Sequence, residues 1–465
     1  MTRRRGNSGV TFWAVGLVVF IVTLLGLPAR ATYGAQTSAD EPQYLLSALS
    51  LFEDGDLDIA DEREDEAYRA FHESSLPVQT VLQPDGSRLS PHNPLLPVYL
   101  AIPVGVAGWV GAKVALAALA GALSALLAWV AVKRFALAGL WAAVVVVVFA
   151  ASPPFALYAT QIYPEIPAAL AVTIAIASLT GPPGRWATAT AGLAVVALPW
   201  LAVKYVPVTA VLAIGALFWL RERRPLQIGL VVGLAASGIV YLWFNQEMYG
   251  GWTPYAAGDF FATGELRALG PEPNYPGRST RLVGLMVDRE FGIAAWQPAY
   301  LLLFPASAAG IRQRMAHRRL LLAILATAWL VATFVAQTMH GWWWPGRQLV
   351  VALPVAVLLI GVWTGPVRAR RFTLVGLGAA GVLSFLIVTA EAAAGRGALI
   401  VDFFDTINPI YRLWSLVLPA YRLEPAGVWI LHGVWLVVVA VLLRLGWRSR
   451  RSVPQQADEV ALETH

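Results

Sequence analysis

The stretch Ser38-Ala39-Asp40-Glu41-Pro42-Gln43-Tyr44-Leu45 places two adjacent carboxylates just after the first long apolar run of the chain, at residues 10–28. Similar runs recur along almost the whole sequence. Hydrophobic residues make up 58% of it and charged residues 13%, and the mean hydropathy is +0.62. These values predict an all-α polytopic membrane protein. Charges at the point where such a chain first leaves the bilayer need a physical reason, because they are costly inside it.

The cysteine count and the distribution of charge exclude several classes of protein. The chain has no cysteine, which excludes disulfides, cysteine-ligated zinc and thiol catalysis. Its net charge of +6 does not indicate nucleic-acid binding, since the arginines lie in short clusters between apolar runs, as the positive-inside rule expects. We therefore expect membrane lipids, and no nucleic acid, among the partners.

Thirteen apolar runs are candidates for membrane-spanning helices. They cover residues 10–28, 94–110, 112–132, 136–152, 165–180, 187–202, 206–220, 226–244, 297–311, 320–337, 348–364, 372–390 and 425–443. The run at residues 94–110 is short, contains three prolines and has no basic cluster at its far end, so we predict a juxtamembrane or re-entrant segment there. About twelve crossings remain, and they place the basic clusters on one side of the membrane.

An even number of crossings with the basic clusters on one side predicts a single transmembrane domain at residues 1–451 with both termini cytoplasmic. We expect the first run to be retained as a helix rather than cleaved as a signal peptide. The chain then has a short cytoplasmic tail at residues 452–465 and three large outer loops, at residues 29–93, 245–296 and 391–424. The first loop holds thirteen acidic residues against four arginines and is expected to contain juxtamembrane helices. Function is commonly carried by long loops of this kind.

The pair Asp40-Glu41 has two compatible interpretations. Adjacent carboxylates near a membrane surface can act as a general base or hold a divalent metal. They can equally mark the start of a helix, with Ser38 or Asp40 as its cap. The acidic run at residues 53–66 is denser but less specific. We interpret it as a solvated surface, since its glycine and ligand spacing does not match a calcium loop.

Polar residues at the other predicted outer ends could share a site with this pair. His92 lies between two prolines and could bind a metal or an anionic phosphate, or be an exposed loop histidine. Tyr163 and Glu165 lie where a helix re-enters the membrane, and an acid at a helix start is also favoured by the helix dipole. Lys204 lies near the outer end of its run, where it could face a polar cavity or extend to the membrane surface.

Two later outer motifs are Asp288-Arg289-Glu290-Phe291-Gly292 and His340-Gly341-Trp342-Trp343-Trp344-Pro345-Gly346-Arg347. Arg347 is the only basic residue of its outer turn, contrary to the orientation rule, so a phosphate is a plausible ligand for it. The tryptophans could stack on a sugar or an isoprenoid, although an interfacial aromatic belt explains most of them.

The order of these motifs resembles the GT-C superfamily of integral-membrane glycosyltransferases, in particular the protein O-mannosyltransferase and aminoarabinose-transferase groups. The resemblance rests on Asp40-Glu41 opening the first outer loop, His92-Asn93-Pro94-Leu95 near its end, Tyr163-Pro164-Glu165 at an outer helix start, and Arg347 late in the chain. The family often has His-Pro-Pro-Leu and Pro-Asp at the second and third of these. The resemblance implies that a first-loop acid is the catalytic base and that the donor is a sugar on a polyprenyl phosphate.

The predicted function is inverting transfer of a sugar from polyprenyl phosphate to a hydroxyl or amine of a glycan, lipid or protein acceptor, on the outer face of the cytoplasmic membrane. A transporter or flippase of lipid-linked glycans, or a non-catalytic member of the same fold, are the alternatives. Asp40 is favoured over Glu41 as the base. The predicted donor-phosphate ligands are Arg347, Lys204 and His92, and the predicted supporting residues are Glu165, Tyr163, Asp288, Glu290 and His340. A divalent cation, Mg²⁺ or Mn²⁺, is a further option, with Asp40, His92 and Glu165 as its ligands.

Overall fold

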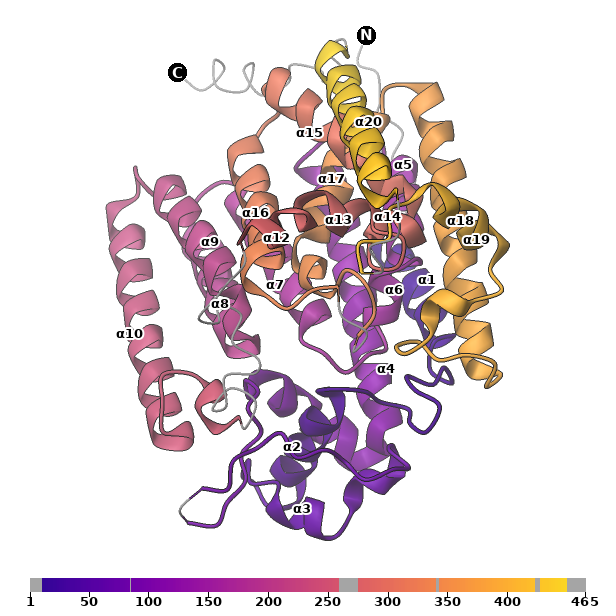
Figure 1. Cartoon of the computed structure of the whole chain (residues 1–465). Helices are drawn as coiled ribbons and strands as arrows, with labels where there is room; N and C mark the ends of the chain where they lie inside the picture. Colours follow the sequence, from indigo (N-terminus) through magenta and orange to yellow (C-terminus); the bar gives the residue numbers. More distant parts are fainter. Residues whose placement is uncertain (1–10, 84, 259–274, 340–342, 423–426, 450–465) are drawn as a thin grey trace.

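The computed structural model describes the chain except for residues 1–10, 84, 259–274, 340–342, 423–426 and 450–465. The described residues form a bundle of helices with a small helical lobe at one end (Figure 1). They contain no β-strand, only isolated bridges between loops. One continuous cluster of buried apolar side chains extends through the bundle and into the lobe. The predicted all-α fold is therefore confirmed.

The bundle consists of α1 (Phe12–Leu24), α4 (Leu95–Lys133), α5 (Gly139–Ala150), α7 (Glu165–Leu179), α8 (Arg185–Leu201), α9 (Val206–Trp219), α10 (Arg224–Tyr249), α15 (Leu303–Arg312), α16 (Arg318–Leu330), α17 (Leu353–Thr364), α18 (Arg368–Ala393) and α20 (Val428–Arg448). Shorter helices connect these or cover their ends: α2 (Glu41–Glu53), α3 (Ala60–Glu64), α6 (Phe155–Tyr158), α12 (Tyr275–Ser279), α13 (Arg281–Val287), α14 (Ile293–Trp296) and α19 (Pro409–Trp414). The remaining turns are η1 (Ala67–Ala70), η2 (Val203–Tyr205), η3 (Pro254–Ala257), η4 (Pro298–Leu302), η5 (Val331–Val335), η6 (Arg347–Ala352), η7 (Phe403–Asp405) and η8 (Ser415–Val417).

Six helical stretches of the described chain are long and apolar enough to cross a membrane. They are α4, α10 with η3, α16 with η5, η6 with α17, α18 and α20. Four shorter apolar helices accompany them, namely α1, α5, α7 and η2 with α9. Helices suit this environment because the hydrocarbon core offers no partner for an unpaired backbone group. The chain is a multi-pass membrane protein, and the count of about twelve crossings stays a prediction from the charge pattern.

Helix α4 contains both the run predicted to be juxtamembrane or re-entrant and the following span. The backbone leaves helical geometry at Ala107 and Gly108, where Gly108 has φ +57°. The hydroxyl of Tyr99 donates to the carbonyl oxygen of Ala115 at 3.1 Å. In a straight helix these residues would lie about 24 Å apart. The first part of α4 therefore folds back against the second, and the break lies at residues 107–108 instead of the predicted boundary at residues 110–112.

The three predicted outer loops contact one another. The amides of Leu399 and Ile400 donate to the carbonyls of Arg30 and Ala31, which joins the third loop to the first. An isolated bridge between Thr80 and Gly258 joins the first loop to the second. In Figure 1, α2 and α3 form the lobe at the bottom of the view, whereas α12, α13, α14 and α19 lie higher, beside the bundle. Segments far apart in sequence thus meet in space, and their position on the outer side of the membrane stays a prediction from the charge pattern.

Candidate active site

The pair Asp40-Glu41 begins α2, and its two carboxylates point to different places. Glu41 is completely buried. Its Oε1 accepts from the amide of Ser38 at 3.1 Å and from that residue's hydroxyl at 3.3 Å, and its Oε2 accepts from the amide of Ile162 at 2.8 Å. The spacing Ser-x-x-Glu and the bond back to the Ser38 amide resemble a capping box. Glu41 thus fixes the start of α2 against the chain at Ile162.

A buried lysine, Lys113, further stabilises this carboxylate. Burial raises the pKa of the Glu41 carboxyl, while the charge of Lys113 and the amide donors oppose that rise. Lys113 is itself buried in α4, and its ammonium donates to the carbonyl of Gln36 at 3.0 Å. The sequence interpretation missed Lys113 and the partner role of Ser38. A lone lysine at the start of an apolar run was the signal that could have identified Lys113.

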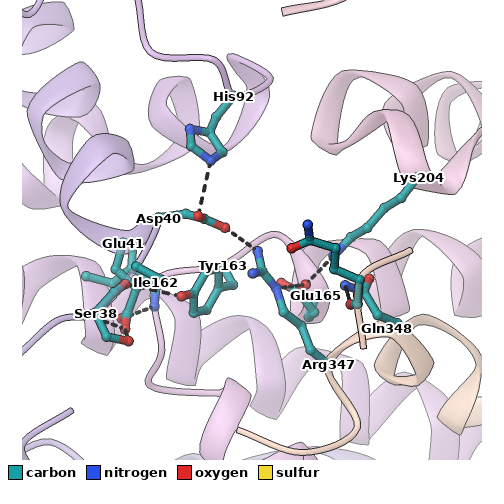
Figure 2. Close-up of polar contacts among 12 residues, drawn as sticks. Ser38, Asp40, Glu41, His92, Ile162, Tyr163, Glu165, Lys204, Arg347 and Gln348 are labelled. Carbon is teal, nitrogen blue, oxygen red and sulfur yellow. Dashed lines mark hydrogen bonds and ion pairs between the residues drawn. The ribbon is translucent and has the colours of Figure 1, made fainter. Parts of the chain in front are cut away.

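Asp40 faces the opposite way, toward basic groups from other parts of the chain (Figure 2). The preceding residue, Ala39, has φ +48°, and this left-handed turn separates Asp40 from the buried Glu41. Asp40 Oδ2 lies 2.9 Å from Arg347 Nη2, and its Oδ1 lies 3.6 Å from His92 Nε2. The Asp40 side chain is 23% exposed, so solvent or a ligand can reach it. Asp40 is therefore the accessible carboxylate of the pair.

The ion pair determines the protonation of Asp40. Burial alone would raise the pKa of the Asp40 carboxyl, but the charge of Arg347 and the contact with His92 outweigh burial and hold that pKa well below its ordinary value. Asp40 is thus ionised at neutral pH. It is also a weak proton acceptor as long as the guanidinium remains beside it.

Arg347 lies at the centre of the polar network (Figure 2). Its Nε lies 2.9 Å from Glu165 Oε1, which also receives Lys204 Nζ at 2.6 Å. Its guanidinium carbon lies 3.9 Å from the centre of the Tyr163 ring. The negative charges of the two carboxylates are balanced by the positive charges of Arg347 and Lys204. This pairing explains how four charges remain stable in a largely buried position.

Local structure holds each member of the network in place. Gly346, with φ +84°, turns the chain into η6 at Arg347. Glu165 begins α7 directly after a proline, where the helix dipole favours an acid. The Nδ1 atom of His92 lies 2.9 Å from the hydroxyl of Ser90, and the His92 ring lies 4.7 Å from the Tyr44 ring. These contacts place six predicted residues in one connected site, namely Asp40, His92, Tyr163, Glu165, Lys204 and Arg347.

The remaining predicted residues lie elsewhere or outside the described structure. Asp288 accepts bonds from the amides of Glu290, Phe291 and Tyr421, which makes it the organiser of a turn. Glu290 pairs with Arg422 at 3.2 Å. The contacts of both acids are therefore with groups outside the network. His340 lies outside the described residues.

The network is not arranged as a metal site. Arg347 lies between the carboxylates of Asp40 and Glu165 and bonds to both, so a cation there would meet a guanidinium. Among the described residues, Asp40, His92 and Glu165 do not bring their ligand atoms together as one ion would require. No step below is assigned to a metal, and a divalent cation at these residues stays a prediction for a chelation assay.

A small pocket lies beside Arg347. Leu285, Phe291, Met339, Trp343, Pro345 and Gln348 contribute to its wall. The Trp343 ring also lies under the guanidinium, 4.7 Å from its carbon atom. The pocket combines apolar walls with one cation.

The fold was compared with those of known proteins. No protein-family model matches the chain, and no curated protein matches it. The structure of ArnT from Cupriavidus metallidurans bound to undecaprenyl phosphate is similar to it, with a TM-score of 0.54 and 15% sequence identity over 94% of this chain and 74% of that one. The apo structure of ArnT gives a TM-score of 0.53 and 14% identity over 94% and 76%. The chain is therefore a multi-pass membrane protein that shares its overall fold with ArnT.

Proposed function

We propose that the chain is a glycosyltransferase that moves a sugar from a polyprenyl-phosphate donor to an acceptor on the outer face of the cytoplasmic membrane. The observation that carries this proposal is the 2.9 Å ion pair of Asp40 and Arg347. It places a group that can accept a proton beside a group that can bind a phosphate. The fold of ArnT, a protein that was solved bound to undecaprenyl phosphate, supports the same donor class.

The proposed reaction is a single displacement at the anomeric carbon. An acceptor oxygen or nitrogen forms a bond to that carbon while its proton passes to Asp40. The bond from the anomeric carbon to the phosphate oxygen breaks, and polyprenyl phosphate leaves with the electron pair. Arg347, with Lys204 nearby, stabilises the negative charge that develops on the leaving phosphate. The sugar inverts its configuration because attack and departure occur on opposite faces.

This geometry requires the Asp40–Arg347 pair to open. In an inverting displacement the base and the leaving group lie on opposite sides of the sugar, so the sugar must come between the two side chains. The donor phosphate competes with the carboxylate for the guanidinium, which carries five N–H donors. Once Arg347 turns to the phosphate, the main cause of the low pKa of Asp40 is removed. Donor binding thereby converts a resting ion pair into a base and a phosphate clamp.

The location of the network fits a lipid-linked donor. Arg347 and Asp40 lie at the junction of the bundle and the lobe, where α2 packs against α4. The first predicted outer loop contains α2 and α3, and it contacts the second and third loops. An isoprenoid could remain in the bilayer while its phosphate reaches Arg347 through the pocket beside Trp343. These features support an extracytoplasmic site with both termini cytoplasmic.

A transporter or flippase of lipid-linked glycans is less favoured. Transporters commonly hold ionisable groups near the middle of the membrane on broken helices in matching halves. Here the charged residues of the site converge at one end and pair with one another. A non-catalytic member of the fold would bind the lipid phosphate without turnover, and the transfer assay separates that case.

The test compares the two adjacent carboxylates in the full chain reconstituted in liposomes. Transfer from polyprenyl-phosphate sugars to an acceptor mixture is measured for Asp40→Asn and Glu41→Gln. We expect Asp40→Asn to lose about 10²–10⁴-fold in turnover because it lacks a proton acceptor. Glu41→Gln should yield less folded protein but retain turnover per folded molecule. Arg396→Gln, at an exposed outer arginine, is the control. Wild-type turnover in Asp40→Asn would rule out its assignment as the base.

A further inference from the structure

The acidic run at residues 53–66 contains one carboxylate that is not solvated. The sequence predicted a solvated surface, but Glu62 on α3 is only 4% exposed. Its neighbours Asp61 and Glu64 are exposed, as expected. The prediction is therefore wrong at Glu62, because packing of α3 against α2 turns this side chain inward.

Glu62 takes part in a cluster of three carboxylates. Asp54, Asp61 and Glu62 each contribute one oxygen, and these oxygens all lie within 4.8 Å of one another. Both carboxylate oxygens of Glu62 are buried without a hydrogen-bond partner. Among the described residues, none of the three acids forms an ion pair with a basic group.

Two neighbouring acids, Asp56 and Asp58, differ from Glu62 because their carboxylates have hydrogen-bond partners. Asp56 accepts from the hydroxyl of Ser50 and from the amide of Asp58. Asp58 in turn accepts from the amides of Ala60 and Arg88. These two carboxylates shape the loop between α2 and α3 and have the partners that such a role requires. Among the acids of this loop and of α3, the buried oxygens without a hydrogen-bond partner are those of Glu62.

Three carboxylates this close repel one another, and a buried carboxylate without a partner is strongly destabilising. The cluster must hold either protons or a cation. Carboxylate oxygens are the ligands that hard divalent cations prefer. Because Asp54 and Asp61 are exposed, water can complete the coordination shell, and the irregular geometry suits Ca²⁺ better than the octahedral Mg²⁺.

We propose that Asp54, Asp61 and Glu62 form a calcium site on the outer lobe, separate from the site around Arg347. Asp54 directly follows α2 as its C-cap, and the other two ligands lie on α3. A bound ion would therefore fix α3 to the end of α2. The same helix carries Asp40 at its beginning, so calcium would stabilise the element that holds the proposed base.

The experiment uses the purified full chain in detergent micelles after treatment with a chelator. Ca²⁺ binding is measured by equilibrium dialysis, and the melting temperature is followed by intrinsic fluorescence. We expect about one ion per chain and a melting temperature that rises with Ca²⁺, because an ion that binds only the folded state stabilises it. Glu62→Gln should weaken binding about tenfold or more, since fewer ligand charges remain. Glu64→Gln, on the same helix but exposed, is the matched control.

Each alternative gives a distinct result. Absence of saturable Ca²⁺ binding up to ~10 mM, beyond the range of extracellular calcium modules, would overturn the proposal. So would unchanged binding in Glu62→Gln, or tighter binding of Mg²⁺ than of Ca²⁺. If the carboxylates share protons instead, Glu62→Gln will melt higher than wild type and Ca²⁺ will change nothing. Asp61→Asn, at an exposed ligand, repeats the test should Glu62→Gln fail to fold.

Discussion

Replacement of Arg347 by glutamine tests the charge balance of the candidate site. The substitution keeps much of the side-chain length but removes the cation from two carboxylates at 2.9 Å. Removing one partner of a buried ion pair commonly costs about 3–5 kcal/mol. Two features reduce that cost here. Glu165 retains Lys204 at 2.6 Å, and the side chain of Asp40 is 23% exposed and can be hydrated.

We therefore expect Arg347→Gln to lower the free energy of unfolding by about 2–4 kcal/mol. The double variant Arg347→Gln/Asp40→Asn should recover part of this loss, because the carboxylate left without its guanidinium is then neutral. A double-mutant cycle should give a coupling energy of about 1–2 kcal/mol between the two residues. The control pair is Arg347→Gln with Arg396→Gln, since Arg396 is exposed and should show additive effects.

The assay is chemical unfolding of the purified full chain in micelles, followed by tryptophan fluorescence, for the wild type, both single variants and the double variant. Binding of polyprenyl phosphate is measured on the same samples and should be lost with Arg347. Additive effects of Arg347 and Asp40 would refute the ion pair as a stabilising contact. Unchanged lipid-phosphate binding in Arg347→Gln would refute its role as the phosphate ligand.

Three further predictions concern pH, packing and the outer turn. Because the folded pKa of Asp40 lies below the ordinary value of 3.8, its stabilising contribution is complete above that pH and is lost as the pH falls below it, so Asp40→Asn should melt with a weaker acid dependence than wild type. Gly111→Ala would place a methyl carbon 2.0 Å from the carbonyl oxygen of Pro103 and should destabilise the fold by about 1–3 kcal/mol in thermal melts, whereas Gly229→Ala, which meets nothing within 4 Å, should not. Asp288→Asn should weaken the turn that three amides anchor and lower stability by about 1–3 kcal/mol, and a loss of turnover per folded molecule would contradict this structural role.

Much of the architecture could be predicted because a membrane protein is constrained by its solvent. A helix must satisfy its backbone internally in hydrocarbon, so apolar runs become helices whatever their neighbours are. Each predicted run coincides with a helical stretch of the described chain, the first run with α1 and the last with α20. Local geometry was less predictable. The break in α4 falls at Gly108, because the return of Tyr99 onto Ala115 depends on packing and not on hydropathy.

The sequence by itself determined that this is a helical membrane protein and predicted that Asp40, His92, Glu165 and Arg347 share one face, because apolar length and arginine clusters report directly on the bilayer. Only the tertiary structure decided which partners each of these residues contacts, and therefore which role it has. Asp40 and Glu41 are chemically almost alike, yet a left-handed turn at Ala39 sends one to Arg347 and the other into a buried contact with Ile162. Such partners come from distant segments, and local sequence carries no information on which of them will meet.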